Sequence, residues 1–125
     1  MIGIDIIKTS RMQALIERFG DKALLKFLCK EERLLVRNYK SAAGYWAAKE
    51  ACSKALGTGI GARCSFFDIK IYKESSGAPK IALSKKVVEM FHIQEVNLSI
   101  THDGEYAVAV VAIRQSTATN EVKQF

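Results

Sequence analysis

Apolar residues recur at two spacings along this 125-residue chain: mostly at helical spacing in the first half, and in alternation with polar residues in the second. Residues 1–7 are short and apolar, interrupted by Gly3 and Asp5, and predict a strand with a carboxylate near its end. A helix capped by Ser10 is expected next, because apolar residues then return every three or four positions, at Met12, Leu15, Ile16 and Phe19.

The first half continues with further helical segments after a break at Gly20 and Asp21. Residues 23–28 keep the helical spacing, and 31–36 are expected to add one short turn. Ser41 is the expected N-cap of a long helix over 42–56, and Gly57 its left-handed C-cap. That helix is rich in small residues, which would let another backbone approach closely: Ala42, Ala43, Gly44, Ala47, Ala48 and Ala51.

In the second half the period changes to two. Residues 67–72 alternate as in a half-buried strand, a turn follows at 75–77, and 79–83 resume an extended chain. A short helix over 84–91 and a strand over 96–101 are predicted next. Asp103-Gly104 is a strong hairpin signal, and the nearly continuous apolar run 106–113 indicates a strand covered on both faces. The pattern predicts a single α+β domain over 1–113, with helices packed on an antiparallel sheet, and a polar tail over 114–125.

Charge adds one feature to this pattern. The net charge is +6, and the segment 8–40 supplies +5 of it, with nine basic residues against four acidic ones. Such a bias suits an anionic partner, whether nucleic acid, an acidic protein or a phosphorylated ligand, and also suits a merely solubilising surface. No apolar stretch approaches the roughly 18 residues of a membrane span, and no secretory leader is evident. Three widely spaced cysteines suggest no disulfide framework, so we expect a cytoplasmic protein.

Three groups of residues could carry chemistry. Glu50 and Lys54 are four apart and share one helix face, just before the glycine-rich loop 57–61. Alone, they fit an exposed helical ion pair; beside the loop, they also fit a phosphate site. Asp5 alone fits a turn residue, whereas together with Glu50 it would make an oxygen site suited to Mg²⁺. His102, at a strand end beside hydroxyl residues, fits either a hairpin-end histidine or a phosphate contact.

Taken in order, several segments resemble the holo-acyl carrier protein synthases, small bacterial 4′-phosphopantetheinyl transferases. The matching segments are Gly3-Ile4-Asp5-Ile6, Ala47-Ala48-Lys49-Glu50-Ala51 with Ser53-Lys54-Ala55, Gly57-Thr58-Gly59-Ile60-Gly61, Phe67-Asp68-Ile69, Gly77-Ala78-Pro79 and Ser99-Ile100-Thr101-His102-Asp103. Each motif alone is weak, but six in register over residues 2–113 are specific. The chain departs from the family at Tyr45-Trp46, where Arg-Phe is frequent.

The resemblance implies an Mg²⁺-dependent enzyme that transfers phosphopantetheine from coenzyme A to a serine of acyl carrier protein, in fatty acid biosynthesis. It implies a homotrimer with active sites between subunits, and metal ligation by Asp5 and Glu50. Lys54 would contact the coenzyme phosphates and, with Glu50, serve catalysis. The other implied coenzyme contacts are Gly57, Gly59, Ser99, Thr101 and His102, the last three reaching the site from a neighbouring chain. Arg11 and Arg18, on the basic helix, would dock the acidic carrier.

Two other readings compete. A non-catalytic basic module could bind acidic protein or nucleic acid, although the aromatic residues are not interleaved with basic ones as a stacking platform would need. A metal-dependent nuclease could use Asp5, Glu50 and a lysine, but such sites usually place Glu and Lys two apart on a strand. We therefore expect neither a nucleic acid nor a membrane as the partner.

Overall fold

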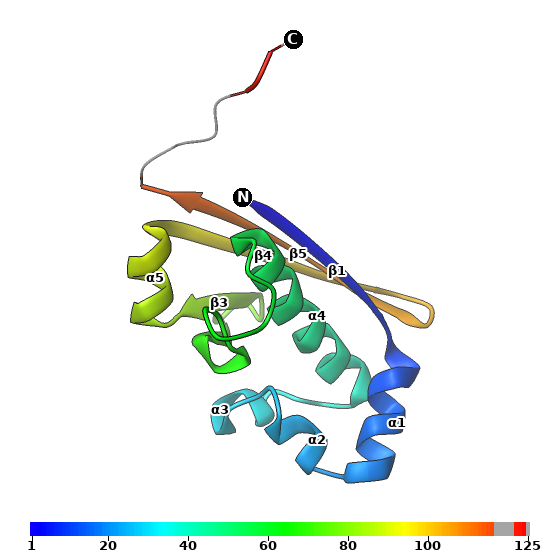
Figure 1. The fold of residues 1–125 in the computed structure, drawn as a ribbon. Coiled ribbons are helices and arrows are strands. Elements are labelled where there is room, and N and C mark those ends of the chain that lie inside the picture. Colours follow the sequence, from blue (N-terminus) through cyan, green and yellow to red (C-terminus); the bar gives the residue numbers. More distant parts are fainter. Residues whose placement is uncertain (117–121, 125) are drawn as a thin grey trace.

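A computed structural model describes residues 1–116 and 122–124 of the chain (Figure 1). Its elements, in chain order, are β1 (Ile2–Lys8), α1 (Thr9–Phe19), α2 (Lys22–Leu25), α3 (Lys30–Arg33), α4 (Tyr39–Leu56), the 3-10 helix η1 (Phe66–Asp68), β2 (Ile69–Lys73), β3 (Pro79–Leu83), α5 (Lys85–Phe91), β4 (Ile93–Asp103) and β5 (Tyr106–Gln115). The expected α+β class with antiparallel strands is confirmed. No helix within the described ranges is long and apolar enough to cross a membrane.

The strands form two antiparallel sheets. β5 lies between β1 and β4 in a three-stranded sheet, and β2 pairs with β3 in a separate hairpin. Strands β4 and β5 are joined at Gly104, whose positive φ of 55° confirms the predicted tight turn. Figure 1 shows α4 crossing one face of the three-stranded sheet, and β3 of the separate hairpin lies against β4, the edge strand of that sheet.

Helix α4 forms the centre of the domain because its small residues let neighbouring elements approach from several sides. Ala42, Ala43, Ala47, Ala48 and Ala51 are fully buried. Strand β1 comes so close that a Cβ atom added at Gly3 would overlap the carbonyl oxygen of Ala51 and lie 2.5 Å from the nitrogen of Ala55. The sequence prediction of close backbone approach is therefore confirmed, and Gly3 is the residue that permits it.

The ends of α4 partly match the prediction. Gly57 is the left-handed C-cap, with φ 78° and ψ 9°, as expected. The N-cap is Asn38, not Ser41: the Asn38 carboxamide accepts hydrogen bonds from the Lys40 and Ser41 amides. Ser41 is the third helical residue, and its hydroxyl accepts a hydrogen bond from the Asn38 amide to complete a capping box. The helix therefore starts three residues earlier than predicted.

Three other predictions need correction. Ser10 lies inside α1, which begins at Thr9 without a side-chain cap. Phe67 is not on a strand face: the Ser65 hydroxyl and the Asp68 carboxylate form a capping box that bends this segment into η1, so Phe67 is exposed. Strand β5 runs on through Gln115, two residues into the predicted tail. Of that tail, 117–121 and 125 lie outside the described residues.

The two faces of the three-stranded sheet differ. The inner face carries Gly3, Asp5 and Ile7 of β1 with the β5 residues Ala107, Ala109, Val111 and Ile113, and packs on α4. The outer face carries Ile2, Ile4 and Ile6, which are 75%, 59% and 59% exposed, beside Val108 and Val110. The prediction that β5 is covered on both faces is therefore wrong for the single chain, and an apolar sheet face remains exposed.

Candidate functional site

Asp5, Glu50 and Lys54 meet where β1 crosses α4. Asp5 lies two residues after Gly3, on the same inner face of β1. The close contact at Gly3 brings this strand against the helix turns that carry Glu50 and Lys54. Both helix residues point to the same side because they are four positions apart. Two segments separated by more than forty residues in sequence thus place three charged groups together.

Lys54 is paired with Asp5 rather than with Glu50. Its ammonium donates a 2.9 Å hydrogen bond to Oδ1 of Asp5 and a 3.3 Å hydrogen bond to the carbonyl oxygen of Ile4. The Asp5 side chain is 15% exposed and that of Lys54 is 52% exposed, so the pair lies at the surface edge of the helix. A cavity of about 460 Å³ opens here, lined by Ile4, Asp5, Ile6, Lys54 and Val108.

The pKa of Glu50 is raised above its ordinary value. Partial burial is the largest cause, the negative charge of Asp5 adds to it, and the positive charge of Lys54 opposes both. A partly desolvated carboxylate whose charge is disfavoured by a second carboxylate beside it is a natural ligand for a cation. No cluster of three or more His, Cys, Asp or Glu side chains is found among the described residues, so the protein would offer these two carboxylates.

The glycine-rich loop follows the site directly. The backbone amide of Gly57 donates to the Lys54 carbonyl, and that of Gly59 to the Ser53 carbonyl, so both are used in ending α4. Gly57 and Gly59 have positive φ, and a Cβ atom at either would meet nothing within 4 Å. Here these glycines turn the chain and leave open space beside Lys54. Their predicted coenzyme contact stays a prediction.

The predicted Ser99, Thr101 and His102 segment lies elsewhere in the same chain. His102 shares the inner face of the sheet with Ala107, and its Nε2 atom lies 3.0 Å from the Lys40 carbonyl oxygen, near the start of α4. Lys40 and Glu50 are ten residues apart on one helix, or about 15 Å. Ser99 and Thr101 lie on the outer face of the sheet, where they pair with Val110 and Val108 of β5. One chain alone does not bring this segment to Asp5 and Glu50.

A second, smaller cavity lies at His102, at the other end of α4. It measures about 190 Å³ and is lined by Ser41, Gly44, Tyr45, Lys73, Pro79, Ile100 and His102. Gly44 makes room for the histidine, because a Cβ atom there would lie 3.2 Å from Nε2 of His102. Tyr45 is buried, and burial raises the pKa of its hydroxyl, which lies 3.5 Å from the Leu35 carbonyl oxygen.

Arg11 and Arg18 lie seven residues apart on α1 and therefore on one face, with Leu15 between them. All three are exposed. The Arg18 guanidinium lies 5.0 Å from the centre of the Phe19 ring, and the Lys26 ammonium lies 5.1 Å from the same ring. This side of α1 thus combines positive charge with exposed apolar surface.

Comparison with known proteins decides the family. Residues 1–111 match the model of the 4′-phosphopantetheinyl transferase superfamily. The chain belongs to that superfamily. The holo-(acyl-carrier-protein) synthase of Sulfurimonas denitrificans is 65% identical over 98% of this chain and 100% of its own length. That of Aliarcobacter butzleri is 54% identical over 89% of this chain and 94% of its own.

Solved structures agree with this membership of the phosphopantetheinyl transferases. The Helicobacter pylori holo-(acyl-carrier-protein) synthase in complex with coenzyme A superposes with a TM-score of 0.88 at 47% identity, covering 91% of this chain and all of that one. The Neisseria meningitidis synthase gives a TM-score of 0.83 at 30% identity, covering 91% and 97%. The resemblance predicted from six ordered motifs is therefore confirmed.

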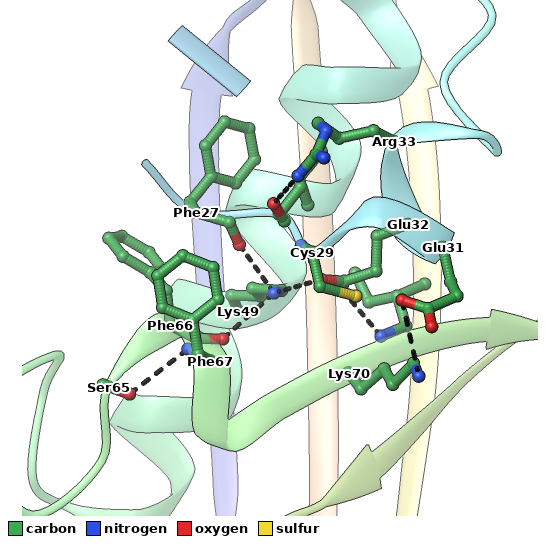
Figure 2. A network of polar contacts seen from close by, with 12 residues as sticks. Phe27, Cys29, Glu31, Glu32, Arg33, Lys49, Ser65, Phe66, Phe67 and Lys70 are labelled. Atoms are coloured by element: carbon green, nitrogen blue, oxygen red, sulfur yellow. Dashed lines mark hydrogen bonds and ion pairs between the residues drawn. The ribbon is translucent and has the colours of Figure 1, made fainter. Parts of the chain in front are cut away.

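Sequence reasoning gave no role to one further feature of this phosphopantetheinyl transferase. Lys49, the neighbour of Glu50, forms a buried ion pair with Glu32, the two side chains being 0% and 1% exposed (Figure 2). Burial is the largest influence on the pKa of Lys49 and lowers it, while Glu32 opposes the shift. The available signal was a lysine that directly follows two alanines, Ala47 and Ala48, on a helix that is buried on most sides.

Proposed function

We propose that this phosphopantetheinyl transferase moves the 4′-phosphopantetheine group of coenzyme A to a serine of apo-acyl carrier protein. The products are holo-acyl carrier protein and adenosine 3′,5′-bisphosphate, and the reaction serves fatty acid biosynthesis. The single observation that carries the proposal is the meeting of Asp5, Glu50 and Lys54 at the crossing of β1 and α4. Close relatives named holo-(acyl-carrier-protein) synthase, one of them solved with coenzyme A, support the choice of substrates.

Asp5 and Glu50 are assigned as ligands of a divalent cation, which we take to be Mg²⁺. The residues fit such a cation because two carboxylates converge in a partly buried place, and one of them has a raised pKa that a cation would lower. Hard oxygen donors suit Mg²⁺, which commonly keeps water and substrate phosphates as further ligands. When bound, the cation would neutralise charge on the coenzyme A pyrophosphate.

Lys54 and Glu50 are assigned the catalytic roles. In the reaction, the serine oxygen of the carrier forms a bond to the phosphorus that bears pantetheine, and the bond from that phosphorus to the bisphosphate oxygen breaks. Lys54 is half exposed at the rim of the 460 Å³ cavity, where its ammonium can reach a phosphate and offset charge on the leaving group. Glu50, or a water that it orients, would accept the serine proton.

A complete site would need a second copy of the chain. Ser99, Thr101 and His102 are proposed to contact coenzyme A, yet in one chain Ser99 and Thr101 lie on the outer face of the sheet. His102 lies near the start of α4, away from Glu50. The exposed apolar face with Ile2, Ile4 and Ile6 could bury itself against other copies. We therefore propose a homotrimer in which a neighbouring chain delivers this segment. Gly57 and Gly59 would border the coenzyme from the first chain.

The basic face of α1 is assigned to the acidic carrier protein. Arg11 and Arg18 are exposed on one side of the helix, and Leu15 between them offers an apolar contact. Charge complementarity of this kind mainly speeds association and orients the partner. The three free cysteines suit a reducing compartment, and we place the enzyme in the cytoplasm.

The deciding experiment uses mass spectrometry. Apo-acyl carrier protein incubated with this chain, coenzyme A and Mg²⁺ should gain the mass of one phosphopantetheine group. Glu50→Gln should abolish most of that gain while keeping the fold, and Glu89→Gln, an exposed change on α5, is the matched control. No mass gain with the unaltered chain would refute the function, and full activity of Glu50→Gln would refute the assigned site.

A further inference from the structure

The buried Lys49–Glu32 pair joins α4 to three other segments. The Lys49 ammonium donates to Oε1 of Glu32 at 2.9 Å, to the Phe27 carbonyl oxygen at 2.6 Å and to the Phe66 carbonyl oxygen at 3.0 Å. These acceptors belong to α3, to the chain just after α2, and to η1. All three donor positions of the ammonium are thereby used, as Figure 2 shows.

Glu32 extends the same network. Its Oε1 atom also accepts a 2.8 Å hydrogen bond from the Cys29 amide, and its Oε2 atom accepts a 2.8 Å hydrogen bond from the Ile71 amide of β2. Among the described residues, no buried side-chain nitrogen or oxygen atom is left without a partner. Both charged groups of the ion pair therefore have hydrogen-bond partners, and these bonds fix the orientation of the two side chains.

Stability alone is a poor explanation for this arrangement. Removing two charges from water is costly, and apolar residues of similar size in place of a buried ion pair are often neutral or stabilising. Directional bonds, by contrast, can set the position of one element against others. Helix α4 needs such a device, because side-chain ridges that lock packed helices are shallow on a surface of Ala42, Ala43, Ala47, Ala48 and Ala51.

Lys49 immediately precedes Glu50, and successive residues on an α-helix are about 100° apart around the axis. Bonds that hold Lys49 toward α3 and η1 therefore also fix the direction in which Glu50 leaves the helix, toward β1 and Asp5. We propose that the Lys49–Glu32 pair is a positioning pair, which fixes the rotation of α4 and so holds Glu50 against Asp5. Neither residue touches the substrate. The choice of readouts rests on the proposed function.

The test replaces both charges at once, so that no buried charge is left unpaired: Lys49→Met with Glu32→Leu. A matched control replaces Lys70→Met with Glu31→Leu, because that pair also joins α3 to β2, at 3.8 Å, but is largely exposed. Three quantities are measured: the melting temperature, the affinity for Mn²⁺ alone by titration calorimetry, and kcat and KM for transfer.

The buried double variant should melt close to the unaltered protein but bind Mn²⁺ about 10- to 100-fold more weakly, the usual effect of losing a group that orients a metal ligand. Its kcat should fall by about 100-fold, with an unchanged KM for the carrier protein, because α1 is untouched. The control should match the unaltered protein in all three. If the buried double variant keeps Mn²⁺ affinity and kcat at control levels, the pair only stabilises the fold and the proposal is wrong.

Two further measurements keep the outcome decisive. If the double variant does not fold, Lys49→Gln replaces it, since the amide keeps two donors but is shorter and neutral; unchanged Mn²⁺ affinity in folded Lys49→Gln would overturn the proposal. If the unaltered protein neither binds Mn²⁺ nor transfers phosphopantetheine, the proposed function fails separately. A crystal structure of the double variant then decides: a displaced Glu50 supports the positioning role, and an undisturbed Glu50 refutes it.

Discussion

The ammonium of Lys54 lies 2.9 Å from Oδ1 of Asp5, so a helix residue and a strand residue 49 positions apart form a charged hydrogen bond at the candidate site. The same lysine is assigned to the coenzyme phosphates. Its hydrogen bond to Asp5 therefore engages an oxygen that is also assigned to the cation. Lys54 and the cation should compete for that oxygen. A bound pyrophosphate, by contrast, should be stabilised by the positive charge of Lys54.

Lys54→Met is expected to separate these two effects. With coenzyme A absent, the variant should bind Mn²⁺ more tightly, by up to about fivefold, because an exposed ion pair of at most about 1 kcal/mol no longer opposes the cation. With coenzyme A present, transfer should fall sharply. Calorimetric titration and a transfer assay measure the two, with Lys70→Met as the control. Weaker Mn²⁺ binding by Lys54→Met in the absence of coenzyme A would contradict the competition.

Gly3→Ala should destabilise the protein and damage the site together. The added methyl group would overlap the Ala51 carbonyl and push β1 away from α4. Overpacking of this kind typically costs about 1–3 kcal/mol. Urea unfolding gives the free energy, and Mn²⁺ titration shows whether Asp5 has moved from Glu50. Gly61→Ala is the matched control, because a Cβ atom there meets nothing within 4 Å. Equal free energies of unfolding for the two variants would contradict the prediction, because they would show that β1 can shift away from α4 without cost.

Arg11→Glu and Arg18→Glu should raise the KM for acyl carrier protein, roughly tenfold for each, and reduce its dependence on salt. The KM for coenzyme A should hardly change, since neither residue lies at the crossing of β1 and α4. Lys85→Glu, on the exposed side of α5, makes the same change in net charge and serves as the control. If that control raises the KM equally, net charge and not the α1 face attracts the carrier.

Much of the fold could be predicted because apolar spacing reports secondary structure directly. The strand at Asp5, the C-cap at Gly57 and the hairpin at Gly104 all follow from local residue types. The errors arose where two local signals compete. Asn38 and Ser41 are both good cap residues, and only their mutual hydrogen bonds show which one comes first. At Phe67, alternation suggested a strand, but the Ser65 and Asp68 side chains bend the chain first.

The candidate site likewise has features that the sequence could predict and features that it could not. Six motifs in order could identify the family, and the proposed roles of Asp5 and Glu50 rest on that resemblance, since neither residue is distinctive alone. The alanines around Lys49 hint that it is buried, but its partner Glu32 could not be found from local pattern, because the two residues are 17 positions apart. The open face of β5 was missed for a different reason. A continuous apolar run indicates burial on both faces without telling whether the same chain or another copy supplies the cover.

Asp68 should make the protein more stable above pH 4 than below it. Burial alone would raise its pKa, but hydrogen bonds from the Ser65 amide and the Ser84 hydroxyl, together with Lys86, outweigh burial and lower the pKa from 3.8 to about 2. A lowered folded-state pKa stabilises the protein above the unfolded-state value, and that stability is lost as pH falls toward the folded-state value. The stability difference between the unaltered protein and Asp68→Asn should therefore shrink between about pH 4 and pH 2. Urea unfolding at several pH values measures it; a constant difference would contradict the assignment.

The three thiols should differ in reactivity. Burial raises the pKa of Cys52 to about 12 and of Cys64 to about 11, and both side chains are inaccessible. Cys29 is partly exposed, although burial raises its pKa as well. A disulfide reagent at pH 8 should therefore label Cys29 in the folded protein, and the other two only after unfolding in guanidinium. Rapid labelling of Cys52 in the folded protein would show that α4 opens more readily than its packing indicates, and rapid labelling of Cys64 would show the same for the loop after α4.

The two glycine contacts on α4 have a consequence for mutational scanning. Gly3 makes room on the strand for the helix near one end of α4, and Gly44 makes room on the helix for His102 near the other. At both places the distance between the packed elements depends on the glycine having no Cβ atom. A scan that truncates side chains to alanine, and skips residues that have none to lose, would never report these positions. Only a scan that adds atoms, with alanine as its smallest addition, would show how narrowly the distance between sheet and helix is set.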